Sequence, residues 1–269
     1  MQNTNCESEK KNRFSPFIPI KGDLAPFFMY VSYALMYPSL IKYKSASESP
    51  LKHLILHKSK KHVNMKGLKG SETKTLLREA AFKLFLTYDY NTVSLKQIEQ
   101  MVNVSRGCLS YHYFSKQEIF VDVIDYYVLH KQESKNKDVV NDMSLWDFIN
   151  AYIQKIKILK DEMSRFLLPD SDTNITRAYM NLILQAERYY VEFNDYMDQI
   201  TLNELRHWEL ILTRAKEKGE IKSTSNVPLL AQLFRNLFIG KSYQDALTCG
   251  LKTEEMRDLF YLQYKLIKT

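Results

Sequence analysis

Glycine and cysteine are both scarce in this sequence. Only 7 of the 269 residues are glycine, and long stretches repeat apolar residues at the spacing of an α-helix, so a mainly helical protein is expected. The three cysteines, Cys6, Cys108 and Cys249, lie far apart and form no CxxC motif and no Cys/His cluster. This spacing argues against a disulfide framework and against a structural zinc site, and it fits a reducing compartment.

The sequence also lacks the signatures of catalysis. It contains no nucleophile elbow, no phosphate-binding P-loop and no paired-carboxylate motif, so we expect neither enzymatic activity nor a cofactor. His53 and His57 have the i, i+4 spacing of a metal-binding pair, and His62 follows them, but no other ligand accompanies these histidines. We therefore predict that the protein has no metal site.

The excess positive charge is confined to one end of the chain. The formal net charge is +7. Residues 1–70 contain 12 Lys/Arg and 4 Asp/Glu, a net of +8, whereas residues 71–269 contain 26 and 27, a net of −1. Because the longer part is nearly neutral, the overall charge is no evidence for nucleic-acid binding, and any affinity for DNA must come from a local patch.

Residues 1–64 differ in kind from the rest of the chain. They contain five of the seven prolines, and their apolar residues follow neither a helical nor a strand period. We expect either a disordered leader or residues foreign to the native protein, with Met65 as its first residue. The uncharged run 24–41 follows basic residues, as a signal peptide or an anchor would, but it starts late and contains two prolines. A membrane-tethered or exported helical protein is therefore kept as an alternative.

From Ser71 onward the chain is periodic to its end, which predicts an all-α protein. No segment longer than four residues alternates apolar and polar residues as a β-strand would. Capping residues and glycines mark the expected boundaries of the helices. Helices are expected to begin at Ser71, after the cap Ser144, near Asn174, after the cap Asn226 and at Thr253. The helix that begins near Asn174 should bend at 194–198 and end near Lys218. The helix capped by Asn226 should end near Gly250.

The most informative stretch covers residues 94–113, where the first of two short helices opens with a capping box. Ser94 and Gln97 form an S-x-x-Q pattern, so this helix should begin at Leu95. Asn103 then interrupts the helical pattern, and asparagine is the best residue after glycine for a left-handed turn position. A tight turn is therefore predicted at Asn103.

A second short helix should follow this turn. Ser105 is expected to cap it, and it should run from Arg106 to about His112. The segment Ser115–Glu118 is a further capping box and should open a longer helix. Two short helices joined by a tight turn, between two longer ones, form a helix-turn-helix unit.

These residues resemble the TetR family of bacterial regulators. The segment from Ile98 to Lys116 aligns without a gap to the family pattern I-A-x-x-A-G-V-S-x-G-T-L-Y-x-H/Y-F-x-S-K, and the preceding helix, with Ala80, Ala81 and Phe85, matches the family's A-x-x-L-F start. The departures are Glu99 and Val102 in place of alanine, Asn103 in place of glycine, Cys108 in place of threonine, and Ser110 where a phosphate-binding tyrosine is usual.

The resemblance implies a three-helix DNA-binding domain over residues 65–131 and a helical ligand-sensing and dimerisation domain over residues 132–269. It further implies a cytoplasmic homodimer that binds a palindromic operator in double-stranded DNA and acts as a repressor under the control of an unknown small-molecule effector. The exposed side chains of the second short helix would read base edges, while the caps and Lys116 would hold phosphates. The implied DNA-binding residues are Ser94, Lys96, Ser105, Arg106, Gly107, Cys108, Ser110, Tyr111, His112 and Lys116. Ser110 also leaves open a helical adaptor that no longer binds DNA.

Three further hypotheses concern dimerisation, ligand binding and oxidation. Apolar residues at helical spacing predict a dimer interface in the last two helices, formed by Leu230, Leu233, Phe234, Leu237, Gly240 and Phe260. The aromatic cluster of Tyr189, Tyr190 and Phe193 predicts a ligand pocket, with a core stripe as the alternative. Cys108 is a candidate oxidant sensor because helix N-termini lower the pKa of a thiol; its alternative is a packing role.

Overall fold

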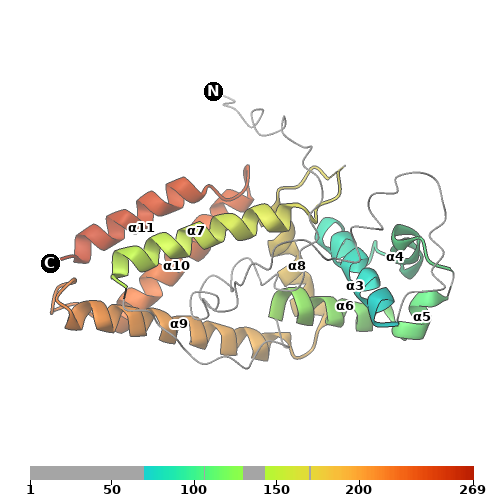
Figure 1. The fold of residues 1–269 in the computed structure, drawn as a ribbon, viewed down its shortest axis with the longest axis horizontal. Helices are drawn as coiled ribbons and strands as arrows, with labels where there is room; N and C mark the ends of the chain where they lie inside the picture. Colours follow the sequence, from blue (N-terminus) through green and yellow to red (C-terminus); the bar gives the residue numbers. More distant parts are fainter. Residues whose placement is uncertain (1–69, 106, 130–142, 170) are drawn as a thin grey trace.

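The computed structural model describes residues 70–269 except Arg106, residues 130–142 and Asp170. The leader 1–64, the run 24–41, the three histidines and the domain boundary at 131/132 lie outside the described residues. Figure 1 shows an elongated molecule with the helix-turn-helix unit at one end and the C-terminal helices at the other. Apart from the isolated bridge between Ile221 and Lys268, the described residues form no strand pairing, and the all-α prediction is confirmed.

The N-terminal unit consists of four helices and a π-helical turn. They are α3 (Gly70–Thr87), α4 (Leu95–Val102), α5 (Cys108–His112), α6 (Lys116–Ile124) and the turn η4 (Asp125–Leu129). Helix α3 packs against α4 and α6, and it buries Leu77, Ala81 and Phe85 completely. The Nε of Arg78 donates to Oδ2 of Asp122 at 2.7 Å, which joins α3 to α6 with a charged hydrogen bond.

The turn η4 continues α6 and is held at two points. The ring of Tyr127 stacks on Phe82 of α3 with centroids 3.9 Å apart. The carboxylate of Asp125 accepts a hydrogen bond of 2.8 Å from the hydroxyl of Tyr190. Single π-helical turns within α-helices are rare, and here the turn lies where α6 meets the rest of the molecule.

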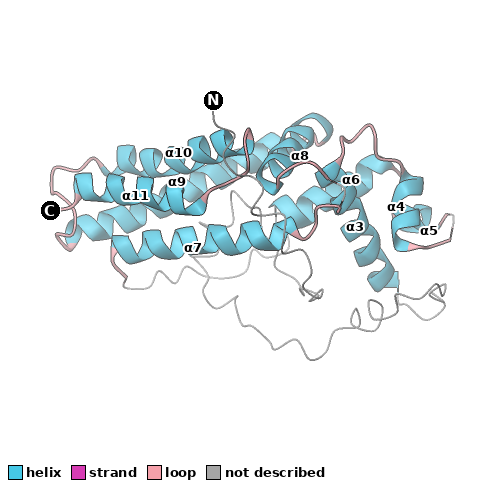
Figure 2. Cartoon of the chain, turned by 90° about the horizontal axis from the view of Figure 1, so that it is seen from above, coloured by secondary structure: helices cyan, strands magenta, loops and turns pink. Residues whose placement is uncertain are grey.

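The C-terminal part is a bundle of five helices, seen from above in Figure 2. They are α7 (Leu145–Ser164), α8 (Ile175–Tyr189), α9 (Phe193–Glu217), α10 (Val227–Ala246) and α11 (Thr253–Ile267). Helix α10 packs on α8 and α9, and α11 packs on α7. At the centre, the buried indole of Trp208 stacks on Phe234 with centroids 5.0 Å apart and meets Tyr152 edge-on.

One buried ion pair joins α9 to α10 in this bundle. The carboxylate of Glu204 accepts from Nε of Arg235 at 2.9 Å, and the guanidinium also donates to the hydroxyl of Thr201. Burial raises the pKa of Glu204 to about 7, although Arg235 acts in the opposite direction. Because burial disfavours the charged form, this carboxylate binds its proton more tightly in the folded protein than in the unfolded chain.

Most predicted helix boundaries of the C-terminal part are confirmed, and two are wrong. Ser144 and Asn226 cap α7 and α10 through their side chains, and Gly219 ends α9 with φ 72°. The bend expected at residues 194–198 is instead a break at residues 190–192, because Tyr190 takes an extended conformation and its hydroxyl is drawn to η4. Helix α10 ends at Ala246 and not near Gly250.

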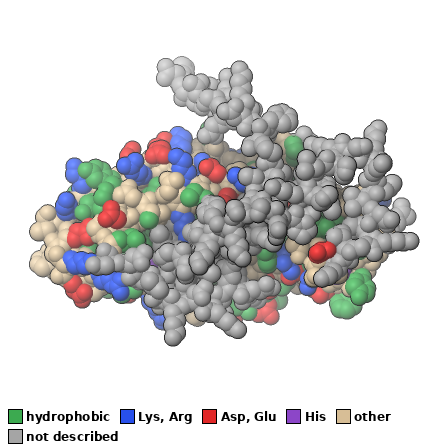
Figure 3. All heavy atoms as spheres, viewed as in Figure 1, with side chains coloured by type: hydrophobic (Ala, Val, Ile, Leu, Met, Phe, Trp, Pro, Cys, Tyr) green, Lys and Arg blue, Asp and Glu red, His purple; other side chains and the backbone are tan. Residues whose placement is uncertain are grey.

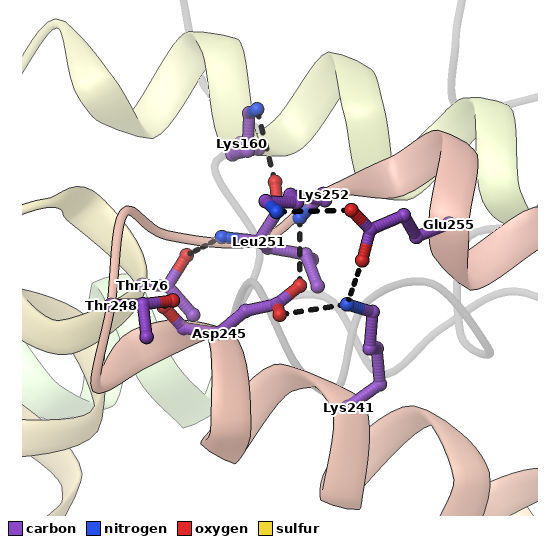
Figure 4. Close-up of polar contacts among 8 residues, drawn as sticks. All are labelled: Lys160, Thr176, Lys241, Asp245, Thr248, Leu251, Lys252 and Glu255. Carbon is purple, nitrogen blue, oxygen red and sulfur yellow. Dashed lines mark hydrogen bonds and ion pairs between the residues drawn. The ribbon is translucent and has the colours of Figure 1, made fainter. Parts of the chain in front are cut away.

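A polar network fixes the connection between α10 and α11 (Figure 4). The buried carboxylate of Asp245 accepts from Nζ of Lys241 at 2.8 Å and from the backbone N–H of Lys252 at 2.9 Å. Lys241 also donates to Glu255 on α11 at 2.6 Å. The backbone of Leu251 is tied to α8 and α7 by hydrogen bonds from its N–H to Thr176 and to its carbonyl from Lys160. These contacts set the mutual orientation of α10 and α11.

No helix in the part of the chain that the structure describes is long and apolar enough to cross a membrane.

Candidate nucleic-acid interface

Helix α4 begins and ends as predicted. The hydroxyl of Ser94 accepts from the backbone N–H of Gln97 at 3.3 Å, and the Gln97 side chain accepts from the backbone N–H of Ser94 at 2.7 Å, so the capping box is complete. Asn103 closes the helix with φ 59° and ψ 39°. It is the one non-glycine residue with positive φ among those described. The left-handed turn between α4 and α5 is therefore confirmed.

The start of α5 differs from the prediction. The helix begins at Cys108 with Gly107 as its N-cap at φ 84°, and no side chain of its own segment caps it, so the role predicted for Ser105 is wrong. The carboxylate of Glu99 on α4 takes that role. Its Oε1 accepts from the backbone N–H of Gly107 at 2.9 Å and of Leu109 at 3.1 Å. The buried Leu109 completes the attachment of α5.

Sequence reasoning did not assign a function to Glu99. The one available signal was that glutamate replaces a small alanine of the family pattern at this position. A carboxylate at the N-terminus of a helix satisfies its unpaired N–H groups and interacts favourably with its dipole. Glu99 thus makes α5, which has only five residues, a fixed element.

Most residues predicted to bind DNA are at the surface. Tyr111 is 84% exposed, whereas Cys108, His112 and Lys116 are half-buried. Arg106 lies outside the described residues. The exposed members are Ser94, Lys96, Ser105, Gly107, Ser110 and Tyr111. These side chains surround the two short helices, and their contacts with DNA remain a prediction.

Phe114, between α5 and α6, is missing from the predicted set. It is 95% exposed, the largest value among the large apolar side chains that the structure describes. Its backbone N–H donates to Oε2 of Glu118 at 2.6 Å, and the hydroxyl of Ser115 accepts from the N–H of Glu118 at 3.1 Å. The ring therefore projects into solvent from a backbone that is fixed by the cap of α6.

Tyr113 anchors the same loop from the inside. It is buried, and its hydroxyl donates to Oδ2 of Asp122 at 2.5 Å. Burial, the hydrogen bond to Asp122 and the charge of that carboxylate raise the pKa of Tyr113 well above its ordinary value. The hydroxyl is consequently protonated at physiological pH and remains a donor.

Lys116 has an internal role that its predicted contact with phosphate did not include. Its ammonium donates to the backbone carbonyls of Tyr90 at 2.9 Å and Val93 at 3.0 Å, and it lies 4.3 Å from the centre of the Tyr90 ring. An ammonium has three donors, so two of them hold the turn between α3 and α4. The contact with phosphate remains a prediction for the third.

The environment of Cys108 does not favour the oxidant-sensor hypothesis. Burial raises the pKa of its thiol, and the nearby carboxylate of Glu99 raises this pKa further. Reaction with oxidants requires the thiolate. The expected lowering by the helix N-terminus is overcome because the same amides are already occupied by Glu99.

The predicted pocket residues lie at the junction between the two parts of the chain. Tyr189 stacks on Tyr90 with centroids 4.1 Å apart, and its hydroxyl accepts from the side-chain amide of Asn91 at 2.9 Å. The side chain of Gln185 accepts from the backbone N–H of Tyr90. Helix α8 therefore contacts the same turn that Lys116 holds.

Tyr190 and Phe193, the other two predicted pocket residues, are buried at this junction. An open depression of about 550 Å³ lies elsewhere, between α3, α4 and Leu168. Its lining residues are Leu84, Tyr88, Thr92, Gln97, Gln100, Met101 and Leu168. The ligand pocket thus remains a prediction. In the described ranges, no three His, Cys, Asp or Glu side chains are grouped to hold a metal ion.

The predicted dimer residues separate into a buried and an exposed set. Leu230, Phe234 and Phe260 belong to the core of the protomer, so they are not available to a partner. Leu233 is 45% exposed, Leu237 is half-buried and Gly240 is exposed. Leu233 belongs to a set of exposed apolar side chains on α10, its C-cap residue and α11, here called the α10/α11 apolar face: Leu229, Leu233, Tyr243, Leu247, Leu259, Leu262 and Leu266.

Residues 77–123, from α3 to α6, match the family of bacterial regulatory proteins named tetR. No curated protein matches the sequence. The fold is similar to reduced NemR of E. coli, with 15% identity, a TM-score of 0.51 and coverage of 73% of this chain and 98% of that one. It is also similar to regulatory protein TetR from Rhodobacter sphaeroides, with 12% identity, a TM-score of 0.50 and coverage of 72% and 97%. At these identities the likeness is one of fold.

Proposed function

The chain belongs to the TetR family of bacterial regulatory proteins through its helix-turn-helix domain, and from this premise we propose that it is a homodimeric repressor that binds a palindromic operator. The observation that carries the proposal is the presentation of α5. The Glu99 carboxylate fixes its N-terminus and Leu109 anchors its inner side, while Ser110 and Tyr111 remain exposed. A short, rigid helix with exposed side chains suits insertion into the major groove.

Two copies of the chain are required because one α5 reads one half-site. The α10/α11 apolar face supports dimerisation, since contiguous exposed apolar side chains mark surfaces that pack against a partner. Gly240 has no neighbouring atom within 4 Å of where a Cβ would lie, so it permits close approach of a second α10. A two-fold interface repeats the same contacts on both subunits.

An effector bound in the C-terminal bundle would act on DNA binding through α8. Tyr189 and Gln185 hold the Tyr90 turn, and Lys116, the first residue of α6, donates a hydrogen bond to the same turn. A displacement of α8 would change the placement of both α4 and α6. The coupling free energy needed for regulation is only about 1–3 kcal/mol.

The test is binding of the full chain to duplex DNA from upstream of its own gene, measured by fluorescence anisotropy beside a random duplex of equal length. The proposal expects tighter binding of the upstream duplex, with a stoichiometry of two chains per site. Specific affinities exceed non-specific ones by at least about 10³-fold. Equal, weak binding to both duplexes would favour the adaptor alternative. Footprinting of bound DNA across the genome would then identify the operator.

A further inference from the structure

Phe114 is exposed in a way that its surroundings do not explain. Large aromatic side chains usually remove most of their surface from water, yet this ring is 95% exposed. It does not belong to a flexible segment. The hydrogen bond from its N–H to Glu118 and the burial of the adjacent Tyr113 fix its backbone on both sides.

The segment from the start of α4 to the start of α6 contains few Lys and Arg residues. Residues 94–118 include three of them, Lys96, Arg106 and Lys116, and two carboxylates, Glu99 and Glu118. Two of the three donors of Lys116 are occupied by backbone carbonyls. At least half of the hydrogen bonds between proteins and DNA go to phosphates and sugars, and this segment offers few Lys and Arg side chains for them.

Apolar side chains occupy this surface instead. Tyr111 is 84% exposed on α5, three residues before Phe114, and Figure 3 shows hydrophobic side chains at the end of the molecule where Figure 1 places α5. The C5-methyl of thymine is the apolar group that the major groove displays, and phenylalanine is among the side chains that contact it. The deoxyribose rings beside it offer further apolar carbon atoms.

We infer that Phe114 is a DNA-contact residue whose ring packs against the apolar groups of the duplex, either thymine methyl groups or deoxyribose carbons. The inference rests on the proposed function. It commits to DNA as the occupant because Phe114 is the middle residue of the three-residue connection between α5 and the N-terminus of α6. A second copy of the chain is not expected there, because the α10/α11 apolar face lies at the opposite end of the molecule (Figure 1).

The experiment compares the wild type with Phe114→Ala, and with Leu202→Ala as the control. Leu202 is an exposed apolar residue on α9, so its truncation removes apolar surface away from α5. Each protein is titrated with the duplex from upstream of its own gene and with the same duplex carrying deoxyuridine in place of thymine, which deletes only the C5-methyl groups. Thermal unfolding and sedimentation establish that all three proteins fold and dimerise alike.

We expect Phe114→Ala to weaken binding of this duplex by about tenfold, which corresponds to about 1.4 kcal/mol, and Leu202→Ala to leave it unchanged. If the ring contacts methyl groups, deoxyuridine weakens binding of the wild type and has little effect on the variant. If it contacts sugars, the variant loses the same factor on both duplexes. Wild-type affinity of Phe114→Ala for both duplexes would overturn the inference, whereas failure of the wild type to bind any duplex would overturn the proposed function.

Discussion

Replacement of Glu99 by alanine tests whether α5 depends on a cap supplied by α4. The substitution removes the acceptor of two backbone N–H groups, those of Gly107 and Leu109. Loss of a helix N-cap costs about 0.5–2 kcal/mol, and hydrogen bonds to charged groups contribute about 1.5–3 kcal/mol where they are buried. Gly107 is exposed, so in the variant water can accept the hydrogen bond from its N–H. The free-energy cost of the substitution therefore comes mainly from the N–H of the buried Leu109.

We therefore expect Glu99→Ala to lower the free energy of unfolding by about 1–2 kcal/mol. For a chain of this size, the Tm should fall by about 2–8 °C. Operator affinity should fall as well, because part of the binding free energy is then used to order α5. Glu99→Gln is the matched control, since its side-chain oxygen can accept the same two hydrogen bonds without the charge.

Hydrogen exchange provides the local measurement. In Glu99→Ala, the amide of Leu109 should exchange faster, while amides in the middle of α3 keep their protection. The glutamine variant should remain close to the wild type, and its affinity for DNA should rise slightly because a negative charge near the phosphates is removed. If Glu99→Ala left both the exchange at Leu109 and the Tm unchanged, α5 would be held by its apolar contacts alone and the capping argument would be wrong.

Four other predictions follow from features described above. Leu233→Glu should give monomers that bind operator poorly, and an unchanged dimer in sedimentation would contradict the α10/α11 interface. Lys116→Ala should weaken operator and random DNA by similar factors and reduce the salt slope by about one unit; an unchanged slope would leave Lys116 only its internal role. Because the pKa of Glu204 is raised to about 7, the folded protein binds more protons than the unfolded chain between the two pKa values. Urea titrations should accordingly show stability decreasing as the pH rises from about 5 to about 7, and Glu204→Gln should flatten this slope. Cys108 should react slowly with iodoacetamide at neutral pH, and rapid alkylation of the folded protein would revive the sensor hypothesis.

The sequence reveals those features of the fold that depend on neighbouring residues. The capping box at Ser94, the left-handed Asn103 and the cap at Ser144 each involve contacts within four residues, so their chemistry can be recognised in the chain. The cap supplied by Glu99 reaches across a turn to residues eight and ten positions away. In the sequence, such a glutamate is indistinguishable from one on a solvated helix edge.

Apolar periodicity also leaves one ambiguity that only packing resolves. Leu233 and Phe234 are adjacent on α10, yet Phe234 is buried against Trp208 and Leu233 is 45% exposed. When a helix has apolar residues on two of its sides, either side can pack against the core of the protein. The assignment of Phe234 and Phe260 to a dimer interface was wrong for this reason. Similarly, the aromatic cluster at Tyr189 was recognised, but its position against Tyr90 depends on tertiary contacts across about a hundred residues of chain.

The π-helical turn η4 gives α6 a place where its winding can change without a break. An α-helix advances by about 100° per residue, and a π-helical turn accommodates more residues for each hydrogen-bonded turn. Conversion of η4 to α-helical winding would rotate Leu129, its last residue, about the helix axis relative to α6. The stacking of Tyr127 on Phe82 and the hydrogen bond from Tyr190 to Asp125 oppose that rotation. A twist of η4 about the helix axis is therefore opposed at two points, by a ring of α3 and by the residue that ends α8.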